Sequence, residues 1–241
     1  MIQLRRLMKL STDTNVKKVL AFVSSIVRKL KNKDREGDNM RILVTGFEPF
    51  LDFKTNPTME IVEVLNGQVI EGYDVFGRIL PVDFEVARNE LIDVVEDIEP
   101  DIIISLGLAA GRFKITPERV ALNVRDGEKD NNSYKPNGEK ISEAGKDSYF
   151  SQLPLTSIID TLQEAGYPAE ISNSAGTYVC NSVMYEGLRY AKGHPNMIAG
   201  FIHIPADFKL AIAHGRIPGW HQRDLMEAVK IAIATTIKGV K

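Results

Sequence analysis

The sequence predicts an α/β fold, a three-layer α/β/α sandwich around a twisted, largely parallel central sheet. From Met40 onward, short strand-like segments alternate with longer segments of helical periodicity, which is typical of such sandwiches. Residues 101–108 (DIIISLGL) form a near-continuous apolar run, as expected for a central strand covered on both faces. Residues 83–100 repeat their apolar positions at helical spacing until Pro100 stops the pattern.

Each remaining element follows from similar local signals. Residues 41–46 (RILVTG) read as a buried strand with a glycine exit, and 69–81 read as extended chain. The polar, glycine-containing stretch 125–147 reads as a long loop. Further strands are expected at 118–124, 169–174 and 197–205, and further helices at 57–67, 154–166, 178–192 and 221–239.

The first 39 residues differ from the rest of the chain. Lys and Arg outnumber Asp and Glu there, and the stretch closes on polar KNKDREGDN. Residues 16–30 carry apolar side chains at helical spacing, and Ser11 or Thr12 could cap that helix. One interpretation is a membrane-surface or targeting helix. The simpler interpretation, which we favour, is a basic extension outside the fold. Residues 40–241 are then a single α/β/α domain.

Composition excludes several classes of protein. Hydrophobic residues make up 44% and charged residues 26%, as in ordinary globular proteins, and the net charge of −2 gives no reason to expect nucleic-acid binding. One cysteine cannot form an internal disulfide, and no apolar run is long enough for a membrane span. The four histidines are scattered, so we expect no metal and no cofactor. The chain is expected to be cytoplasmic.

Three reactive residues fall where strands are expected to end. Ligand sites in open α/β sheets lie at the carboxyl ends of the strands. Cys180 opens a helix, whose amino end favours thiolate over thiol. His203 lies at the end of an apolar strand, and Glu118 follows the glycine-rich exit of the central strand. A cysteine, a histidine and an acid together are a recurrent solution to thiol activation.

Each of the three also has an ordinary structural explanation. Cys180 could be a small packed hydrophobe, and His203 could be a core histidine whose hydrogen bonds are satisfied. Glu118 could simply pair with Arg112 or Arg119 on the surface. Spacing alone leaves the choice between these explanations and an enzyme open.

Four blocks of the sequence resemble those of a known protein family. They are VTGFEPF (44–50) with NPT (56–58), GLAAGR with ITPERVALN (within 107–123), SNSAGTYVCN (172–181) and GFIHIP (200–205). In this order they resemble the pyrrolidone-carboxyl peptidases, also called pyroglutamyl peptidases I, a family of cysteine peptidases. The resemblance covers most of the chain from Met40 to Pro205. It implies hydrolysis of the amino-terminal pyroglutamyl residue from peptides through a thioester.

The resemblance also implies roles for individual residues. The catalytic residues would be Cys180 as nucleophile, His203 as base and Glu118 as the group that orients His203. Phe47 and Phe50 would help to form the substrate pocket, although core packing is the alternative for both. Tyr178 lies next to the nucleophile, and Asn56 would support the pocket with its amide. The partners implied are peptides with amino-terminal pyroglutamate and further copies of the chain, in a homodimer or homotetramer.

Two departures from the family pattern limit how far the roles of the family's residues can be assigned to this chain. The family has glycine after the second phenylalanine of the first block, where this chain has Leu51-Asp52. The family's loop after the VALN strand reads like ARIPDN with an arginine near the active site, whereas this chain has VRDGEKDNNSYKP. Whether Arg125 replaces that arginine stays open at this stage.

Two other functions compete with the peptidase. A catalytically silent α/β protein could bind blocked peptide ends, but the presence of Cys180, Glu118 and His203 argues against it. A nucleoside-phosphorylase-like enzyme would need a phosphate-binding fingerprint. Only the glycines of LGLAAGR suggest one, and they are a weak signal.

Overall fold

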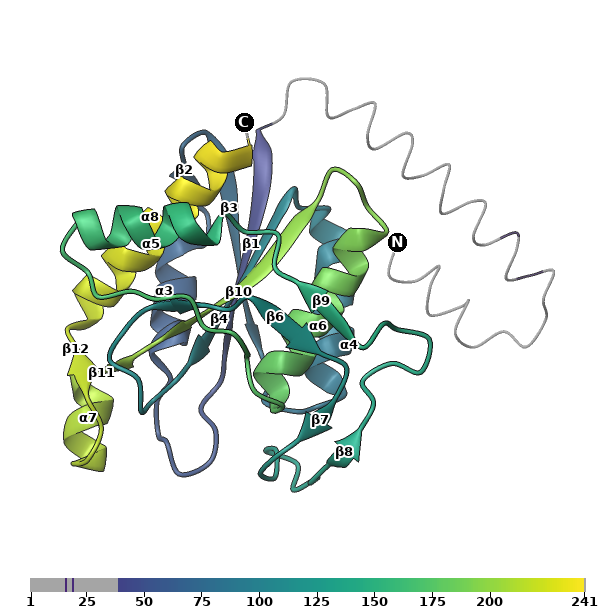
Figure 1. The fold of residues 1–241 in the computed structure, drawn as a ribbon, viewed down its shortest axis with the longest axis horizontal. Helices are drawn as coiled ribbons and strands as arrows, with labels where there is room; N and C mark the ends of the chain where they lie inside the picture. The colour runs from purple at the N-terminus through teal and green to yellow at the C-terminus, as the bar shows by residue number, and fades with distance from the viewer. Residues whose placement is uncertain (1–15, 17–18, 20–38, 241) are drawn as a thin grey trace.

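The fold is an α/β/α sandwich built on a six-stranded sheet of order β2-β3-β1-β4-β10-β5 (Figure 1). The computed structural model describes Val16, Val19 and residues 39–240. The four inner strands are mutually parallel, and the short edge strands β2 and β5 run antiparallel to their neighbours. The sheet strands are β1 (Met40–Phe47), β2 (Val69–Ile70), β3 (Tyr73–Leu80), β4 (Ile102–Leu108), β5 (Thr116–Pro117) and β10 (Ile198–Ile204).

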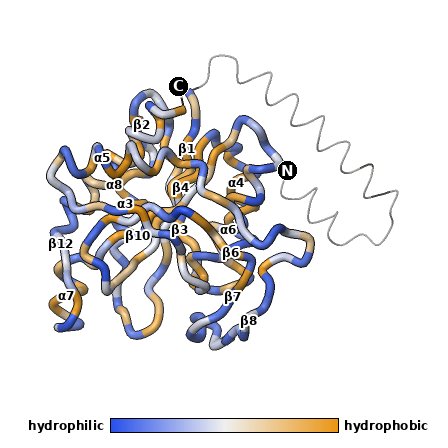
Figure 2. Tube along the Cα trace, in the orientation of Figure 1, coloured by the Kyte–Doolittle hydropathy of each residue, from blue (hydrophilic) through white to orange (hydrophobic). Residues whose placement is uncertain are grey.

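Helices cover both faces of this sheet. One face packs against α3 (Pro57–Leu65), α5 (Leu155–Glu164) and α8 (Gln222–Val240), and the other packs against α4 (Val86–Ile98) and α6 (Val179–Lys192). Neighbouring residues of a strand point to opposite faces. Ile102 and Ile104 of β4 therefore join the first core, whereas Ile103 joins the second. The hydrophobic segments are concentrated in these central layers (Figure 2). The predicted fold class is confirmed.

The ends of the helices follow from local capping chemistry. Asn56 caps α3 because its side-chain oxygen accepts the N–H of Thr58 at 3.1 Å, and Pro57 occupies the first helical turn, where its missing donor costs nothing. Helix α4 ends one residue before Glu99, which adopts a left-handed conformation (φ 52°) ahead of Pro100. These caps place the helix boundaries within a few residues of the predicted ones.

The prediction of a strand at 169–174 was wrong. This segment makes only isolated bridges, from Ala169 to Ile115 and from Ser172 to Glu118. Pro117 lies between the two bridges and has no N–H, so the segment cannot form a continuous ladder. Cys180 consequently begins its helix after an irregular segment rather than after a strand.

The region between β4 and α5 also differs from the prediction. Only Val120–Leu122 (β6) of the expected strand 118–124 is extended, and it pairs with β9 (Ser148–Phe150) outside the main sheet. The predicted loop 125–147 contains an irregular hairpin of β7 (Arg125–Asp126) and β8 (Asn137–Glu139). Three elements were not predicted: helix α7 (Phe208–His214) and the flanking strand pair of β11 (Ala206–Asp207) and β12 (Gly219–Trp220).

Most of the amino-terminal segment lies outside the residues that the structure describes. The helix predicted at 16–30 and its caps lie, apart from Val16 and Val19, outside the described residues. In the part of the chain that the structure describes, no helix is both long and apolar enough to cross a bilayer.

Candidate active site

The candidate site lies at the carboxyl ends of the parallel strands, where the sequence placed it. Phe47 is the last residue of β1, Leu108 is the last of β4, and His203 is the penultimate residue of β10. The register pairs His203 with Gly107 and Ile204 with Leu108. The ends of three neighbouring strands therefore meet beside the amino end of α6, which carries Cys180.

A buried hydrogen bond joins two of the predicted catalytic residues. His203 Nδ1 lies 2.7 Å from Glu118 Oε1, and both side chains are shielded from solvent. Glu118 follows β5, and its backbone N–H bonds to the carbonyl of Phe201 in β10. A carboxylate on Nδ1 favours the tautomer with the proton on that nitrogen, which leaves Nε2 as the base.

The geometry leaves no space for any side chain at position 107. A Cβ there would lie 2.7 Å from the Phe201 ring and 2.8 Å from Cδ2 of His203. Gly107 thus allows the imidazole to lie flat against β4. The ring of Phe201 lies 4.9 Å from the imidazole, between centroids, and limits its movement further.

Arg112 is the second side chain hydrogen-bonded to Glu118, and it carries a full positive charge. Its Nη1 donates to Glu118 Oε1 at 2.9 Å and to Thr116 Oγ1 at 2.7 Å. The ordinary explanation for Glu118 was a surface pair with Arg112 or Arg119. Arg112 is indeed its partner, but the carboxylate is fully buried and binds His203 through the same oxygen. Its other oxygen, Oε2, is buried without a hydrogen-bond partner among the described residues.

Cys180 lies in the first turn of α6, partly buried. Burial raises the pKa of its thiol to about 12, and the negative charge of Glu118 acts in the same direction. Its own backbone N–H and the charge of Arg112 act in the opposite direction without cancelling the effect. The amino end of the helix acts toward thiolate as expected, but burial and Glu118 outweigh it, so the thiol form is favoured at neutral pH.

All four predicted pocket residues lie around one pocket next to this cysteine. The pocket is partly open to solvent. Its lining consists of Phe47, Phe50, Asn56, Val82, Leu108, Tyr178, Val179 and Cys180. The sequence analysis missed Val82, Leu108 and Val179. Leu108 could have been found, because it ends the apolar run of the central strand and therefore lies at the carboxyl edge of the sheet.

Two of these pocket residues are fixed by polar bonds of their own. Asn56 donates from Nδ2 to the carbonyl of Glu48 at 3.1 Å, while its oxygen accepts from Thr58, so its amide supports the pocket wall. Tyr178 donates its hydroxyl to the carbonyl of Lys129 at 2.8 Å. Burial raises the pKa of Tyr178 to about 12, with a further contribution from Asp130, which keeps this hydroxyl a donor.

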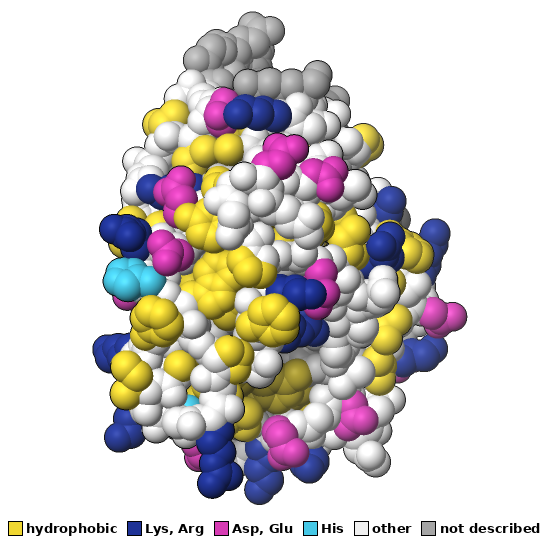
Figure 3. Space-filling view, turned by 60° about the vertical axis from the view of Figure 1, so that its left-hand side comes forward, with side chains coloured by type: hydrophobic (Ala, Val, Ile, Leu, Met, Phe, Trp, Pro, Cys, Tyr) yellow, Lys and Arg dark blue, Asp and Glu magenta, His cyan; other side chains and the backbone are white. Residues whose placement is uncertain are grey.

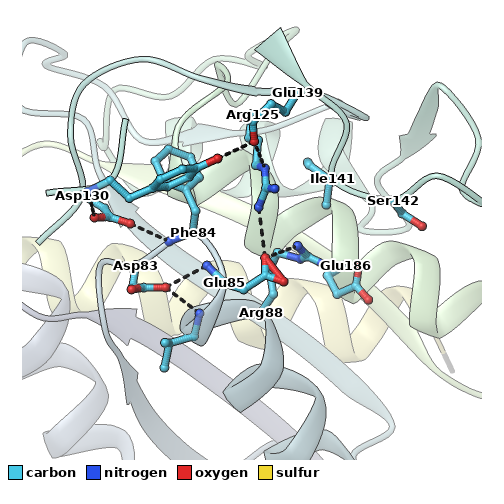
Figure 4. A network of polar contacts seen from close by, with 12 residues as sticks. Asp83, Phe84, Glu85, Arg88, Arg125, Asp130, Glu139, Ile141, Ser142 and Glu186 are labelled. Carbon is cyan, nitrogen blue, oxygen red and sulfur yellow. Dashed lines mark hydrogen bonds and ion pairs between the residues drawn. The ribbon is translucent and has the colours of Figure 1, made fainter. Parts of the chain in front are cut away.

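Arg125, by contrast, is engaged away from the pocket. Its guanidinium lies 3.0 Å from both Glu85 and Glu139 and over the ring of Tyr134 (Figure 4). Among the described residues, no group of three or more His, Cys, Asp and Glu could hold a metal ion.

A cysteine at a helix start, whose thiol senses the charge of a buried carboxylate that is hydrogen-bonded to an imidazole, completes the set of groups that cysteine-dependent hydrolases use. Residues 40–239 match the sequence profile of the pyroglutamyl peptidases. The chain belongs to this family, which consists of cysteine peptidases.

Individual relatives agree with this assignment. The chain is 62% identical over 198 residues to a pyrrolidone-carboxylate peptidase of Lysinibacillus sphaericus, covering 82% of this chain and 97% of the relative. A solved structure of a mutant pyrrolidone carboxyl peptidase from Pyrococcus furiosus matches with a TM-score of 0.80 at 42% identity, covering 84% of this chain and all of the other. The Thermococcus litoralis pyrrolidone carboxyl peptidase matches with a TM-score of 0.79 at 38% identity, over 83% and 94% of the two chains.

Proposed function

We propose that this chain removes the amino-terminal pyroglutamyl residue from peptides, with Cys180 as nucleophile, His203 as general base and acid, and Glu118 as the residue that orients His203. The observation that carries the proposal is the buried Glu118–His203 pair, which lies beside a pocket lined by Cys180 in a member of the pyroglutamyl peptidase family. The named relatives support the substrate class.

The high pKa of Cys180 determines how the reaction begins. Because the thiol is protonated at neutral pH, it needs a base as it attacks. His203 Nε2 takes the thiol proton while Sγ bonds to the carbonyl carbon that joins pyroglutamate to the next residue. The tetrahedral intermediate collapses to a thioester, and the imidazolium gives its proton to the departing amine. Backbone N–H groups at the start of α6 are the proposed donors to the oxyanion.

The second half of the reaction uses the same groups. Water loses a proton to His203 and attacks the thioester carbonyl. The C–S bond then breaks, pyroglutamate leaves, and Cys180 regains its proton. Through both halves, the Glu118 carboxylate stabilises the imidazolium whenever it forms.

The pocket suits the proposed substrate. The pyroglutamyl ring is flat and uncharged, and such ligands bind in apolar pockets with a few placed polar groups. Phe47, Phe50 and Tyr178 would supply apolar surface, and Asn56 would hold the wall that carries the two phenylalanines.

The proposal extends to the domain limits, the cellular location and the assembly of the protein. Residues 40–241 form the catalytic domain, and the basic segment 1–39 lies outside it. The chain works in the cytoplasm. It assembles as a homodimer or homotetramer, which the hydrophobic side chains exposed on the face around α7 support (Figure 3). Those of Phe113, Phe208 and Ile212 are 57%, 51% and 80% exposed.

Hydrolysis of a fluorogenic pyroglutamyl amide tests the proposal. The full chain and residues 40–241 alone should both release the fluorophore, whereas Cys180→Ala and His203→Ala should not. Equal turnover by the Cys180→Ala protein would exclude the assigned nucleophile. Failure of the wild-type chain to cleave the amide, together with an unaltered fold, would exclude the activity itself.

A further inference from the structure

The walls of the pocket come from three separate parts of the chain. Phe47 and Phe50 flank the segment that follows β1, Val82 follows β3, and Tyr178 precedes α6. The sheet holds the first two walls together only as far as the strand ends. Beyond that point, Glu48 is their direct link, since its Oε1 accepts the N–H of Val82 at 3.0 Å.

Asn131 adds three hydrogen bonds to these two walls. Its Nδ2 donates to Glu48 Oε1 at 2.8 Å and to the carbonyl of Pro49 at 2.9 Å. Its backbone N–H donates to the carbonyl of Val82 at 2.9 Å. One exposed residue of the loop after β7 thus fastens the segment of the two phenylalanines to the segment of Val82.

The same loop also holds the third wall, which carries Tyr178. Two residues before Asn131, the carbonyl of Lys129 accepts the hydroxyl proton of Tyr178. Gly127, at a φ of +126° that disfavours other residues, faces the Tyr178 ring, since a Cβ there would lie 3.5 Å from Cδ2. That ring packs edge-on against Phe84 at 5.2 Å between centroids.

The part of this loop that contains Lys129 and Asn131 is held in place by hydrogen bonds of its own. The buried Asp130 accepts the N–H groups of Asn132 and Tyr134 at Oδ1 and that of Phe84 at Oδ2. Figure 4 shows Asp130 directed at Phe84, with Arg125 bridging Glu85 and Glu139 at the base of the same loop. Three bonds to Asp130 and two to Arg125 hold the backbone of the loop independently of the Asn131 side chain.

We infer that Asn131 is a positioning residue for substrate binding: it sets the spacing between the walls that enclose the pyroglutamyl ring. This inference rests on the proposed function. Both side-chain N–H groups are needed, because both of their acceptors are oxygen atoms of the pocket wall. An aspartate at this position would lack both donors and would place a second carboxylate against Glu48. Asn131 lies outside the pocket lining, so it acts on binding through the walls and not on the reacting atoms.

Asn132 provides a matched control. It is the same residue type, adjacent and also exposed, but its Nδ2 donates at 2.7 Å to Asp83, which accepts the N–H groups of Glu85 and Val86 and does not line the pocket. The experiment compares Asn131→Ala, Asn131→Asp and Asn132→Ala with the wild-type full chain. It measures KM and kcat for a fluorogenic pyroglutamyl amide, and the inhibition constant of pyrrolidin-2-one, the lactam ring alone.

We expect Asn131→Ala to raise both KM and the inhibition constant about fivefold, with kcat within about twofold of wild type. Asn131→Asp should raise them further, because its carboxylate has no donor for Glu48 Oε1 or the Pro49 carbonyl and repels the Glu48 carboxylate. Asn132→Ala should leave both constants unchanged.

Three results would overturn the inference. An unchanged KM and inhibition constant in Asn131→Ala would show that the walls do not depend on this side chain. Equal increases in the Asn131→Ala and Asn132→Ala proteins would reveal only a general loosening of the loop. A loss of thermal stability with unchanged KM would assign Asn131 a purely structural role. Absence of wild-type turnover would instead remove the proposed function, and the inference with it.

Discussion

Replacement of Arg112 by methionine tests whether the buried carboxylate of the site depends on the charge of Arg112 as well as on its bond to His203. Arg112 and His203 both bind Oε1 of Glu118, and the Glu118 side chain is 0% exposed. Methionine keeps much of the length of the side chain and removes its charge and its donors. Glu118 would then keep only His203 as a partner, with Oε2 still unbonded.

The expected cost follows from the burial of the two partners. Removing one partner of a fully buried ion pair costs about 3–5 kcal/mol, and a hydrogen bond to a charged group is worth about 1.5–3 kcal/mol. The Arg112 side chain is 37% exposed, so water already screens its charge and the lower range applies. We expect the free energy of unfolding to fall by about 1.5–3 kcal/mol, which lowers Tm by about 3–12 °C for a domain of this size.

Thermal unfolding of Arg112→Met and Arg119→Met measures this difference directly. Arg119 is exposed, and among the described residues its side chain donates only to Asn173, at 2.8 Å, so its replacement should cost no more than about 0.5 kcal/mol. In a Glu118→Gln background, Arg112→Met should cost less, because no buried charge remains to be compensated. Equal losses for the two arginines, or the same loss in both backgrounds, would refute the reasoning.

Three further outcomes follow from the site and its supports. Gly107→Ala should lower kcat/KM about a hundredfold, because the new methyl group would displace the His203 ring; activity within threefold of wild type would contradict the clash. Cys180 is the only cysteine, so the difference in ultraviolet absorbance between the wild type and Cys180→Ala measures its thiolate. No thiolate absorbance is expected at pH 8, and the absorbance should rise only above about pH 10. Asn181→Ala should cost about 2–4 kcal/mol in denaturant unfolding, because it removes the partner of the Leu122 N–H and of the Leu122 and Val124 carbonyls; a loss below 1 kcal/mol would show that water replaces the amide.

The sequence predicted the parts of the fold that local pattern determines. The central strands could be recognised because β4 and β10 are apolar on both faces, which only a strand covered by helices on both sides requires. Helix α4 could be recognised from its periodicity and from Pro100. The location of the site followed from the same pattern, since residues at the carboxyl ends of parallel strands must share one edge of the sheet.

The remaining parts depend on contacts between distant segments. Residues 169–174 look like a strand, and the position of Pro117 opposite them becomes visible only after folding. The loop 125–147 has little apolar periodicity because polar bonds to the rest of the protein hold it, as Asn131 with Glu48 and Arg125 with Glu85 illustrate. Such pairs leave no trace in periodicity or in local propensity.

Cys180 shows how two correct local rules can oppose each other. The amino end of a helix favours the thiolate, and burial beside a carboxylate disfavours it. The second effect dominates here, because it raises the pKa of Cys180 to about 12 although the backbone N–H acts to lower it. In the proposed mechanism, a protonated resting thiol makes Cys180 depend on proton transfer to His203 at the moment of attack. The base in turn depends on Glu118 to hold its tautomer, and Glu118 depends on Arg112 to remain stable without solvent. The reactivity of the cysteine thus originates in a chain of partners that begins at the molecular surface.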